Sequence, residues 1–584
     1  MLSLEKWRHA RQYMINRLLN TFIRERLGAF DRAVANPGCP LFRYLYVDID
    51  GFIIRIAVKP HDFLQDWYTE ASHWQVNVDG NWRHRSNMMA LMRRLYRSTG
   101  GCEETLKLAI AEYKQAVFQA ILRPVPKASI IGYSTLGMDS LKHYDHLAAF
   151  VDHPLYPTAR AKLGFSAQDL IHFSPEYQND FTLIWLAIDK RKVTLTDEMP
   201  DFWPSFSDVG LLQSLSQDFQ LFPVHPFTLS MTLQALKDHH IDYRLAPLRA
   251  ITVIPTLSVR TLIIKSHSHY HLKLPLPIRT LSTKNIRLVK PSTLYDGHNI
   301  AMLLNKIIST DVMLSQRLSV CDESQGAHIA DDSKLAYIVR HYPKTDHQCI
   351  IPVAALSADE NGKLVVCRVA DRYYQGDINA FLTDYLHLQL SVHLRLVINY
   401  GIALEANQQN SMLLIDTSLN KPRLSLLLKD NDAPRIEAKF IKSYHPHLNQ
   451  YLDKLKDIRI KEADCNSLIQ MFITIILQLN CACIIEILTA KALVDRHWAY
   501  QRLGELLSQL LTKTNDGSIS RRSSLIRSTL FEADYLDIKY LYTAGTFLPK
   551  SKTLATDINK FYGQTARNFI KKAAFQLKEC DVAS

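Results

Sequence analysis

Hydroxyl, guanidinium and ammonium groups follow one another on two predicted strands near the middle of the chain. In the segment ITVIPTLSVRTLIIKS, alternation along a strand places Ser258 and Arg260 on one face and Thr261 on the other. In the next segment, YHLKLPLPI, His271 and Lys273 share a face and leucines form the opposite face. An arginine fork, a lysine point charge and a short hydroxyl donor suit phosphate oxygens. The two segments are therefore suited to a nucleotide-phosphate site, although spacing alone favours a polar edge strand for the first of them.

A second group of polar residues surrounds a predicted hairpin. A helix that ends at Gly401 leads into the segment EANQQN, and a hairpin over residues 412–415 and 424–428 then leads to Asp430 and Asp432. Protein kinases hold magnesium ions on a nucleotide with an amide residue and an aspartate in a comparable layout. The alternative is that these are turn-forming Asn and Asp residues beside a hairpin. The candidates for nucleotide and metal binding here are Glu405, Asn407, Gln409, Asn410 and Asp430.

The segment DHPLYPTARAKLGF forms a third cluster. Its two prolines stiffen a turn and fix His153 and Tyr156 relative to it, and Arg160 and Lys162 follow as two cations for a carboxylate-bearing substrate. A rigid structural turn is the alternative. A metal site is the weaker interpretation of three alternating histidines further on, because no Cys or carboxylate nearby completes a coordination set; these are His267, His269 and His271.

The elements that would position these residues can be read from the spacing of apolar residues. Residues 4–30 and 88–121 show the period of amphipathic helices, with a strand-like insertion at residues 44–58. Short apolar runs between residues 181 and 286 indicate strands. The helical period returns at 381–400 and dominates from residue 438 onward, apart from a polar loop predicted at residues 515–524. The expected fold class is therefore α+β or mixed α/β, with helical ends and a mixed middle.

Composition narrows the class of partner and the compartment. The 584 residues carry 69 Lys and Arg against 57 Asp and Glu, a net charge of +12, without an arginine-rich run. A small anionic substrate is therefore favoured over nucleic acid. Nine scattered cysteines without Cys-x-x-Cys spacing, and an N-terminus without a long apolar core, predict a cytoplasmic protein. The apolar stretch at residues 468–488 contains four polar residues and is predicted to be a buried core helix, not a membrane span.

Taken together, these segments resemble the siderophore synthetases that work independently of nonribosomal peptide synthetases (NIS synthetases), of the aerobactin-synthetase type. The resemblance lies in the order and spacing of several motifs across roughly 300 residues. The motifs are SLKHYDHLAAFVDHPLYPTARAKLGF, FPVHPF, TLSVRT, HLKLPLPIRTLSTKNIR, DSKLAYIVR, GIALEANQQN and LLLKD.

The resemblance implies a fold like a cupped hand. We expect a thumb-like, mainly helical domain at residues 1–150, a β-rich, fingers-like domain at 151–375, and a largely helical, palm-like domain at 376–584. The resemblance also implies a homodimer that binds ATP and magnesium between fingers and palm. The implied activity is siderophore biosynthesis for iron acquisition. A carboxylate, typically of citrate, is activated as an acyl adenylate and condensed with an amine, hydroxylamine or alcohol, releasing AMP and pyrophosphate.

The same resemblance implies a role for each matching residue. The expected ATP ligands are Ser258, Arg260, Thr261, Lys273, Gln409, Asn410 and Asp430. The expected magnesium ligands are Asn410, Asp430 and Glu405, and the expected catalytic residues are Arg287, Lys273, Glu405 and Asn407. The expected substrate ligands are His153, Tyr156, Arg160, Lys162, Thr283, Arg287 and Arg340.

The chain also departs from the family pattern. Tyr156 and Asn407 each replace a histidine, Lys429 replaces an arginine, and Arg160 and Lys162 are exchanged. Phe227 and Thr228 replace a Trp-Gln pair. Phosphate-binding positions match better than substrate-binding ones. The alternative function is therefore a divergent homologue that binds ATP or a metabolite without completing the condensation.

Overall fold

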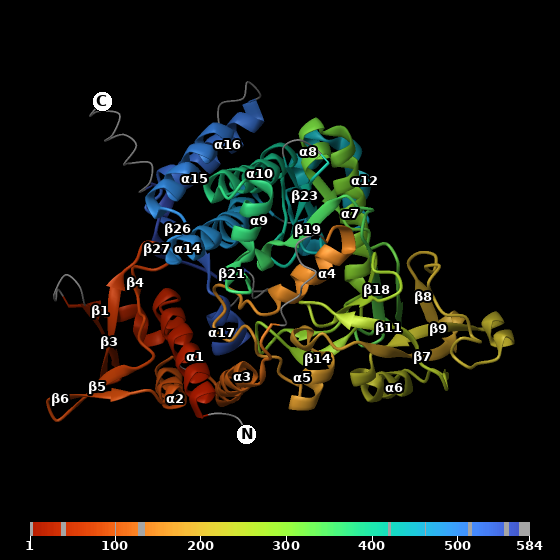
Figure 1. The fold of residues 1–584 in the computed structure, drawn as a ribbon, viewed down its shortest axis with the longest axis horizontal. Coiled ribbons are helices and arrows are strands. Elements are labelled where there is room, and N and C mark those ends of the chain that lie inside the picture. Colours follow the sequence, from red (N-terminus) through yellow and green to blue (C-terminus); the bar gives the residue numbers. More distant parts are fainter. Residues whose placement is uncertain are drawn as a thin grey trace.

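The computed structural model describes residues 4–36, 43–99, 101–126, 135–418, 422–461, 463–511, 517–553 and 560–571. The N-terminal part pairs an antiparallel sheet with three helices on one of its faces (Figure 1). The strand order is β1-β2-β3-β5-β6, with β4 on β3. The helices are α1 (Leu4–Arg24), α2 (Met88–Ser98) and α3 (Glu103–Leu122). The strands are β1 (Val34–Ala35), β2 (Arg43–Ile49), β3 (Phe52–Pro60), β4 (Trp67–Tyr68), β5 (Trp74–Val78) and β6 (Asn81–Arg85).

Alternation along these strands explains how the N-terminal sheet buries one face. Leu45 and Val47 on β2, and Ile54 and Ile56 on β3, are buried in one core with the apolar faces of the helices. The expected strand-like insertion at residues 44–58 is confirmed, although the sheet continues to Arg85. The predicted helical stretch at residues 88–121 is divided into two helices.

The middle of the chain forms a larger sheet of nine strands. Its order is β10-β7-β11-β12-β13-β18-β17-β8, with β9 on β7, and its pairings are antiparallel. A short hairpin of β14 and β15 follows β13. The strands are β7 (Phe181–Asp189), β8 (Val193–Leu195), β9 (Phe219–Val224), β10 (Tyr243–Leu245), β11 (Ala250–Pro255), β12 (Thr261–Ile264), β13 (Tyr270–Lys273), β14 (Leu276–Arg279), β15 (Ile286–Arg287), β17 (Gly326–Ile329) and β18 (Ala336–His341). The helices here are α4 (Gly137–Ala148), α5 (Ala167–Phe173) and α6 (Leu229–Asp238).

One local prediction in this sheet is wrong. Ser258 and Arg260 do not alternate along a strand, because the chain turns sharply between β11 and β12. Val259 lies at the centre of this turn with φ of +65°, a conformation that a β-branched residue rarely adopts. Because valine disfavours this conformation, the sequence did not predict a turn here. The strand alternation of His271 and Lys273 on β13 is confirmed.

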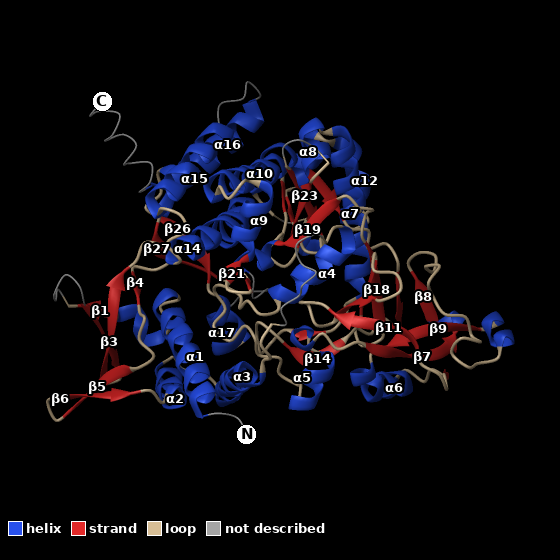
Figure 2. Ribbon diagram, viewed as in Figure 1, coloured by secondary structure: helices blue, strands red, loops and turns tan. Residues whose placement is uncertain are grey.

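The C-terminal half encloses a four-stranded sheet between helices (Figure 2). The strand order is β16-β24-β23-β19. The two central strands, β23 and β24, form the predicted hairpin, which is therefore confirmed. The two outer strands, β16 and β19, come from before residue 353 and pair with this hairpin. The strands are β16 (Leu318–Val320), β19 (Gln348–Pro352), β20 (Asp359–Glu360), β21 (Lys363–Leu364), β22 (Ile402–Ala403), β23 (Ser411–Asp416), β24 (Arg423–Leu428), β25 (Arg435–Ile436), β26 (Tyr535–Lys539) and β27 (Tyr562–Arg567). The helices are α7 (Pro291–Thr310), α8 (Val312–Arg317), α9 (Val365–Tyr373), α10 (Ile378–Tyr400), α11 (Ala438–Tyr444), α12 (Asn449–Leu452), α13 (Cys465–Met471), α14 (Cys483–Ala490), α15 (Arg496–Leu510), α16 (Gly517–Phe531) and α17 (Lys550–Thr553).

The apolar segment Cys465–Ala490 is a core helix, as predicted. It is long and apolar enough to cross a membrane, but 94% of its most apolar window is buried inside the protein. Its middle, Phe472–Ala482, is π-helical, and the polar side chains within it have partners. Gln478 donates to the Asp537 carbonyl at 2.7 Å, and Asn480 donates to the Ala406 carbonyl at 2.8 Å. The helix thus anchors the loop after α10.

The polar loop predicted at residues 515–524 is wrong over its described part. Residues 512–516 lie outside the described residues, and α16 begins at Gly517. Ile526 and Leu530, one helical turn apart, are fully buried in the core. Serine and arginine residues dominate the first half of α16 and mask this narrow apolar stripe.

A buried histidine on α10 makes stability depend on pH. His393 is 2% exposed, and burial lowers its pKa to about 3, below the value of about 6.5 in an unfolded chain. Between these two pKa values the unfolded chain binds more protons than the folded protein. The contribution of His393 to stability is therefore complete above about pH 6.5 and is lost as the pH falls toward 3. Lowering the pH from 7 to 5 should reduce the free energy of unfolding of both proteins. We expect the reduction to be about 2 kcal/mol smaller in His393→Leu than in the parent. Urea denaturation at each pH measures this difference.

The control for His393→Leu is His9→Leu, a substitution at an exposed position on α1. It should leave the pH dependence of the parent unchanged. Parallel pH curves for the parent and His393→Leu would contradict the role given to His393.

Candidate active site

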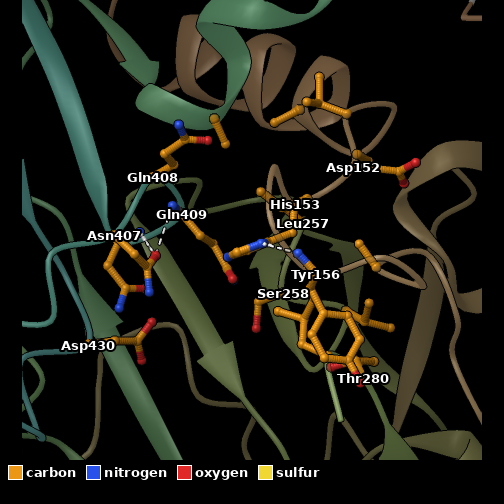
Figure 3. A pocket seen from close by; sticks show the side chains of 18 of the residues that line it. Asp152, His153, Tyr156, Leu257, Ser258, Thr280, Asn407, Gln408, Gln409 and Asp430 are labelled. Carbon is orange, nitrogen blue, oxygen red and sulfur yellow. Dashed lines mark hydrogen bonds between the residues drawn. The ribbon is translucent and has the colours of Figure 1, made fainter. Parts of the chain in front are cut away.

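Residues from distant parts of the sequence meet around a cavity of about 400 Å³ (Figure 3). One wall is the turn after α4, and another is formed by the β11–β12 turn with β13. The loop between β14 and β15 and the loops after α10 and β24 complete the lining. The candidate residues that line the cavity are His153, Tyr156, Arg160, Lys162, Ser258, Arg260, Lys273, Arg287, Glu405, Asn407, Gln409, Asn410 and Asp430.

Two arginines on the sheet side of the cavity have neutral partners. Arg260 donates to the Leu288 carbonyl, and the Nε of Arg287 donates to Thr280 Oγ1 at 2.5 Å. Burial, and then repulsion from Arg260, lowers the pKa of Arg287 to about 9, so it is still cationic at neutral pH. Burial also lowers the pKa of Arg260. Two desolvated guanidinium groups with neutral hydrogen-bond partners strongly favour an anion between them.

A charge network lies beside these arginines. Lys273 Nζ and Arg340 Nη2 lie 2.6 and 2.7 Å from the same oxygen of Asp430, and Arg340 also pairs with Glu323. Burial alone would raise the pKa of Asp430, but Arg340 and Lys273 hold it well below its usual range. Asp430 is therefore a carboxylate, and it fixes the Lys273 ammonium group at the cavity wall.

Oxygen atoms suited to a magnesium ion line the same part of the cavity. Asn410 Nδ2 donates to the Glu405 carbonyl at 3.1 Å, which leaves Oδ1 as the acceptor atom of this amide. Asp430 and Asp432 line the cavity nearby, and burial raises the pKa of Asp432. Carboxylate and amide oxygens are the ligands that magnesium prefers, so the donor set fits the ion. The Glu405 carboxylate lies 3.6 Å from Lys539 Nζ.

At the other end of the cavity, acidic residues already balance the predicted cations. Arg160 makes a two-point contact with Asp152, with nitrogen–oxygen distances of 3.0 and 2.5 Å. Lys162 Nζ lies 2.5 Å from Glu176. We therefore expect these two pairs to shape the cavity wall more than to supply free positive charge.

His153 and Tyr156 differ in what they offer to the cavity. His153 Nδ1 accepts the backbone N–H groups of Leu155 at 3.2 Å and of Tyr156 at 3.1 Å, and Figure 3 draws the contact with Tyr156. Burial, and then Arg17, lowers the pKa of His153 to about 3, so the ring is neutral with its proton on Nε2. The Tyr156 hydroxyl contacts Glu112 at 2.8 Å and Thr546 at 2.7 Å. His153 is thus a neutral donor, and the Tyr156 hydroxyl is engaged inside the protein.

Three predicted site residues support the lining from behind. Thr261 Oγ1 lies 3.1 Å from Ser258 Oγ, and Thr283 N–H donates to Thr546 Oγ1 at 3.1 Å. Arg340, 1% exposed, is held by its two carboxylates. Residues outside the predicted set also line the cavity: Asp152, Glu176, Thr280, Gln408, Asp432 and Lys539.

These additional residues differ in whether the sequence could have predicted them. Asp432 follows Asp430 in the predicted metal segment and could have been included in the site. Lys539 ends β26, 109 positions after Asp430 in the sequence, and reaches the cavity only through the packing of β26. No local pattern marks it.

Asn407 shapes the loop that carries Gln409 and Asn410. Its Oδ1 accepts the backbone N–H groups of these residues at 3.0 and 3.2 Å (Figure 3). Because each of these two bonds contributes about 1 kcal/mol, we expect Asn407→Ala to slow turnover about tenfold or more. Asn407→His introduces a titrating ring and should change the pH dependence of the rate. Steady-state rates from pH 6 to 9 measure both effects.

The matched control is Asn77→Ala. Asn77 Oδ1 accepts the Gly80 N–H at 3.0 Å in the exposed turn between β5 and β6. Its loss should not affect turnover. Unchanged kinetics in both Asn407 variants would show that this residue has no part in the reaction.

Comparison with known proteins shows which families two parts of the chain resemble. Residues 142–358 match the model of the IucA / IucC family, and residues 379–542 match the model described as ferric iron reductase FhuF-like transporter. The chain is 24% identical to staphyloferrin A synthase of Staphylococcus aureus, over 49% of the chain and 51% of that protein. It is 22% identical to aerobactin synthase of Escherichia coli, over 52% of the chain and 57% of that protein. The matched region thus spans about half the length of these curated relatives.

Solved structures confirm the mixed α/β fold over nearly the whole chain. The petrobactin biosynthesis protein AsbB from Bacillus anthracis gives a TM-score of 0.77 at 17% identity, covering 98% of this chain and 97% of that one. ATP-bound aerobactin synthetase IucA from Klebsiella pneumoniae gives a TM-score of 0.69 at 14% identity, covering 96% and 99%. The chain therefore carries an IucA/IucC family domain and is homologous to staphyloferrin A synthase, aerobactin synthase and other NIS synthetases.

Proposed function

We propose that this protein is an ATP-dependent siderophore synthetase. It would adenylate a carboxylate of citrate or a related polycarboxylic acid and condense it with an amine, hydroxylamine or alcohol. The relatives include an L-2,3-diaminopropanoate–citrate ligase and a D-ornithine–citrate ligase, whose names share citrate as a substrate. The observation that carries the proposal is the convergence of Arg260, Lys273 and Arg287 on one cavity that also contains magnesium-compatible oxygens.

The geometry suggests how the first step would proceed. Ser258, Arg260 and Lys273 would bind the triphosphate, while His153 would orient the substrate carboxylate through its Nε2–H. A carboxylate oxygen would attack the α-phosphorus, and pyrophosphate would leave. Arg287 would stabilise the negative charge that grows on the phosphate oxygens, because it is desolvated and already held by Thr280.

Asn410, Asp430 and Glu405, together with Asp432 beside them, would hold magnesium, which when bound would supply positive charge against the phosphate oxygens. In the second step, the amine would attack the acyl carbon, and AMP would leave with the bonding electron pair. The homodimer, the cytoplasmic location and the division into three domains at residues 150 and 375 stay predictions.

The second candidate function is binding of ATP or a metabolite without condensation. The replacement of two family histidines by Tyr156 and Asn407 supports it, because neither residue can carry a proton near neutral pH as histidine does. Such a protein would bind ATP without releasing pyrophosphate.

A trapping experiment separates the two functions. With magnesium, ATP, citrate and hydroxylamine, which captures activated acyl groups, we expect pyrophosphate, AMP and a citryl hydroxamate in equal amounts. Omitting citrate is the control and should abolish pyrophosphate release. Release of ADP and phosphate would contradict adenylation, and ATP binding without any release would favour the second candidate.

A further inference from the structure

The loop that carries Arg287 depends on a distant part of the chain. Residues 280–285 connect β14 to β15, and Thr280, Leu281, Asn285 and Arg287 line the cavity. Leu281 has φ of +54°, which is unfavourable for a leucine. The β14–β15 pairing is also irregular between Leu276 and Arg279. Contacts from outside the hairpin must therefore stabilise this loop conformation.

Those contacts come from the π-helical turn Thr543–Phe547 and its flanks, which we call the C-terminal clasp (residues 542–548). Ser282 Oγ donates to the Gly545 carbonyl at 2.6 Å, and Thr283 N–H donates to Thr546 Oγ1 at 3.1 Å. Lys284 Nζ donates to the Ala544 carbonyl at 2.5 Å. Three successive loop residues are thus bound to one turn about 260 positions later in the sequence.

The clasp packs too closely against the loop for much movement. Ser282 and Thr283 are buried at 0% and 3% exposure. A Cβ atom placed on Gly545 would lie 3.2 Å from Ser282 Cβ, tighter than an ordinary van der Waals contact. Any side chain at this position would therefore push the loop and the clasp apart.

The clasp is in turn fixed to the N-terminal part of the chain. The backbone N–H groups of Tyr542 and Thr543 donate to Glu25 at 3.1 and 2.7 Å. Thr546 Oγ1 lies 3.0 Å from Glu112 on α3, and Phe547 is fully buried among aromatic rings from the N-terminal core. The clasp therefore transmits the position of α3 to the β14–β15 loop.

We propose that Thr546 is a positioning residue that holds the β14–β15 loop so that Arg287 faces the cavity. Its hydroxyl is the atom that joins Glu112 and Tyr156 on one side to the Thr283 backbone on the other. The inference rests on the proposed function, in which Arg287 contacts the phosphate groups. It assigns a role to a hydroxyl that does not line the cavity.

A double-mutant cycle of Thr546 and Arg287 tests this role. Calorimetry would measure the affinity of each variant for inorganic pyrophosphate in the presence of magnesium. Thr546→Val removes the hydroxyl and keeps the shape, so we expect pyrophosphate binding to weaken about tenfold. In an Arg287→Ala background, the same substitution should weaken binding less than about twofold, because its effect passes through Arg287. Thr546→Ser should restore binding.

Two further variants guard against a general loss of structure. Lys284→Met removes the hydrogen bond from the loop to the Ala544 carbonyl of the clasp. It should weaken pyrophosphate binding in the parent, and much less in the Arg287→Ala background. Thr232→Val, at a buried threonine on α6, should bind pyrophosphate as the parent does. Equal losses in both backgrounds, or no rescue by serine, would overturn the role of Thr546 alone. A parent protein that binds no pyrophosphate would overturn the phosphate site as well.

Discussion

Lys273→Ala is expected to lower the rate of pyrophosphate release about 100- to 1000-fold. Lys273 lies at the end of strand β13, and its ammonium group is held 2.6 Å from the Asp430 carboxylate. The ammonium group is therefore already in position when negative charge develops on the phosphate. Losing a preorganised donor of this kind typically costs about 3 to 4 kcal/mol in the transition state. A coupled pyrophosphate assay at saturating ATP and citrate measures the loss.

The fold should survive this change. Asp430 keeps its contact with Arg340 at 2.7 Å, so the carboxylate is not left unpaired. Lys265→Ala is the matched control, because Lys265 pairs with Asp180 at the surface and the exchange should leave the rate unaltered. A folded Lys273→Ala protein with a rate near that of the parent would remove Lys273 from the mechanism.

Arg287→Ala should cause a loss of similar size, for a different reason. The Arg287 guanidinium is half-buried and bonded to the neutral Thr280 hydroxyl, so its charge is available to an anion in the cavity. Its removal should cost about 3 to 4 kcal/mol in the transition state, or roughly 100- to 1000-fold in rate. Arg287→Lys should recover only part of this loss, because lysine keeps the charge and loses the planar fork. Rates with varied ATP and citrate measure both variants.

The control for Arg287 lies in the same hairpin. Arg279 ends β14, is half-buried and does not line the cavity, so Arg279→Ala should retain turnover. If Arg287→Lys were fully active, the positive charge alone would suffice at this position, and the planar fork of Arg287 would have no part in the reaction.

The sequence predicted best those site residues whose positions depend on local periodicity. Lys273 follows from alternation along β13, and the pair Asn410 and Asp430 follows from the β23–β24 hairpin between them. These features depend on neighbours within a few positions. The spacing of apolar residues reports such neighbours directly.

Features that depend on long-range packing left no comparable signal. The sequence shows Arg160 and Lys162 as two free cations, whereas in the structure Asp152 and Glu176 balance them. Lys539 reaches the cavity only because β26 packs there. The β11–β12 turn was missed for another reason, since Val259 adopts a left-handed conformation that its residue type disfavours.

Transfer of labelled oxygen tests the adenylation claim most directly. The protein would be incubated with magnesium, ATP, hydroxylamine and citrate whose carboxyl oxygens are oxygen-18, and the products would be analysed by mass spectrometry. Attack of a carboxylate oxygen on the α-phosphorus predicts a single heavy oxygen in AMP and none in pyrophosphate. Heavy oxygen in inorganic phosphate, or unlabelled AMP, would contradict the account.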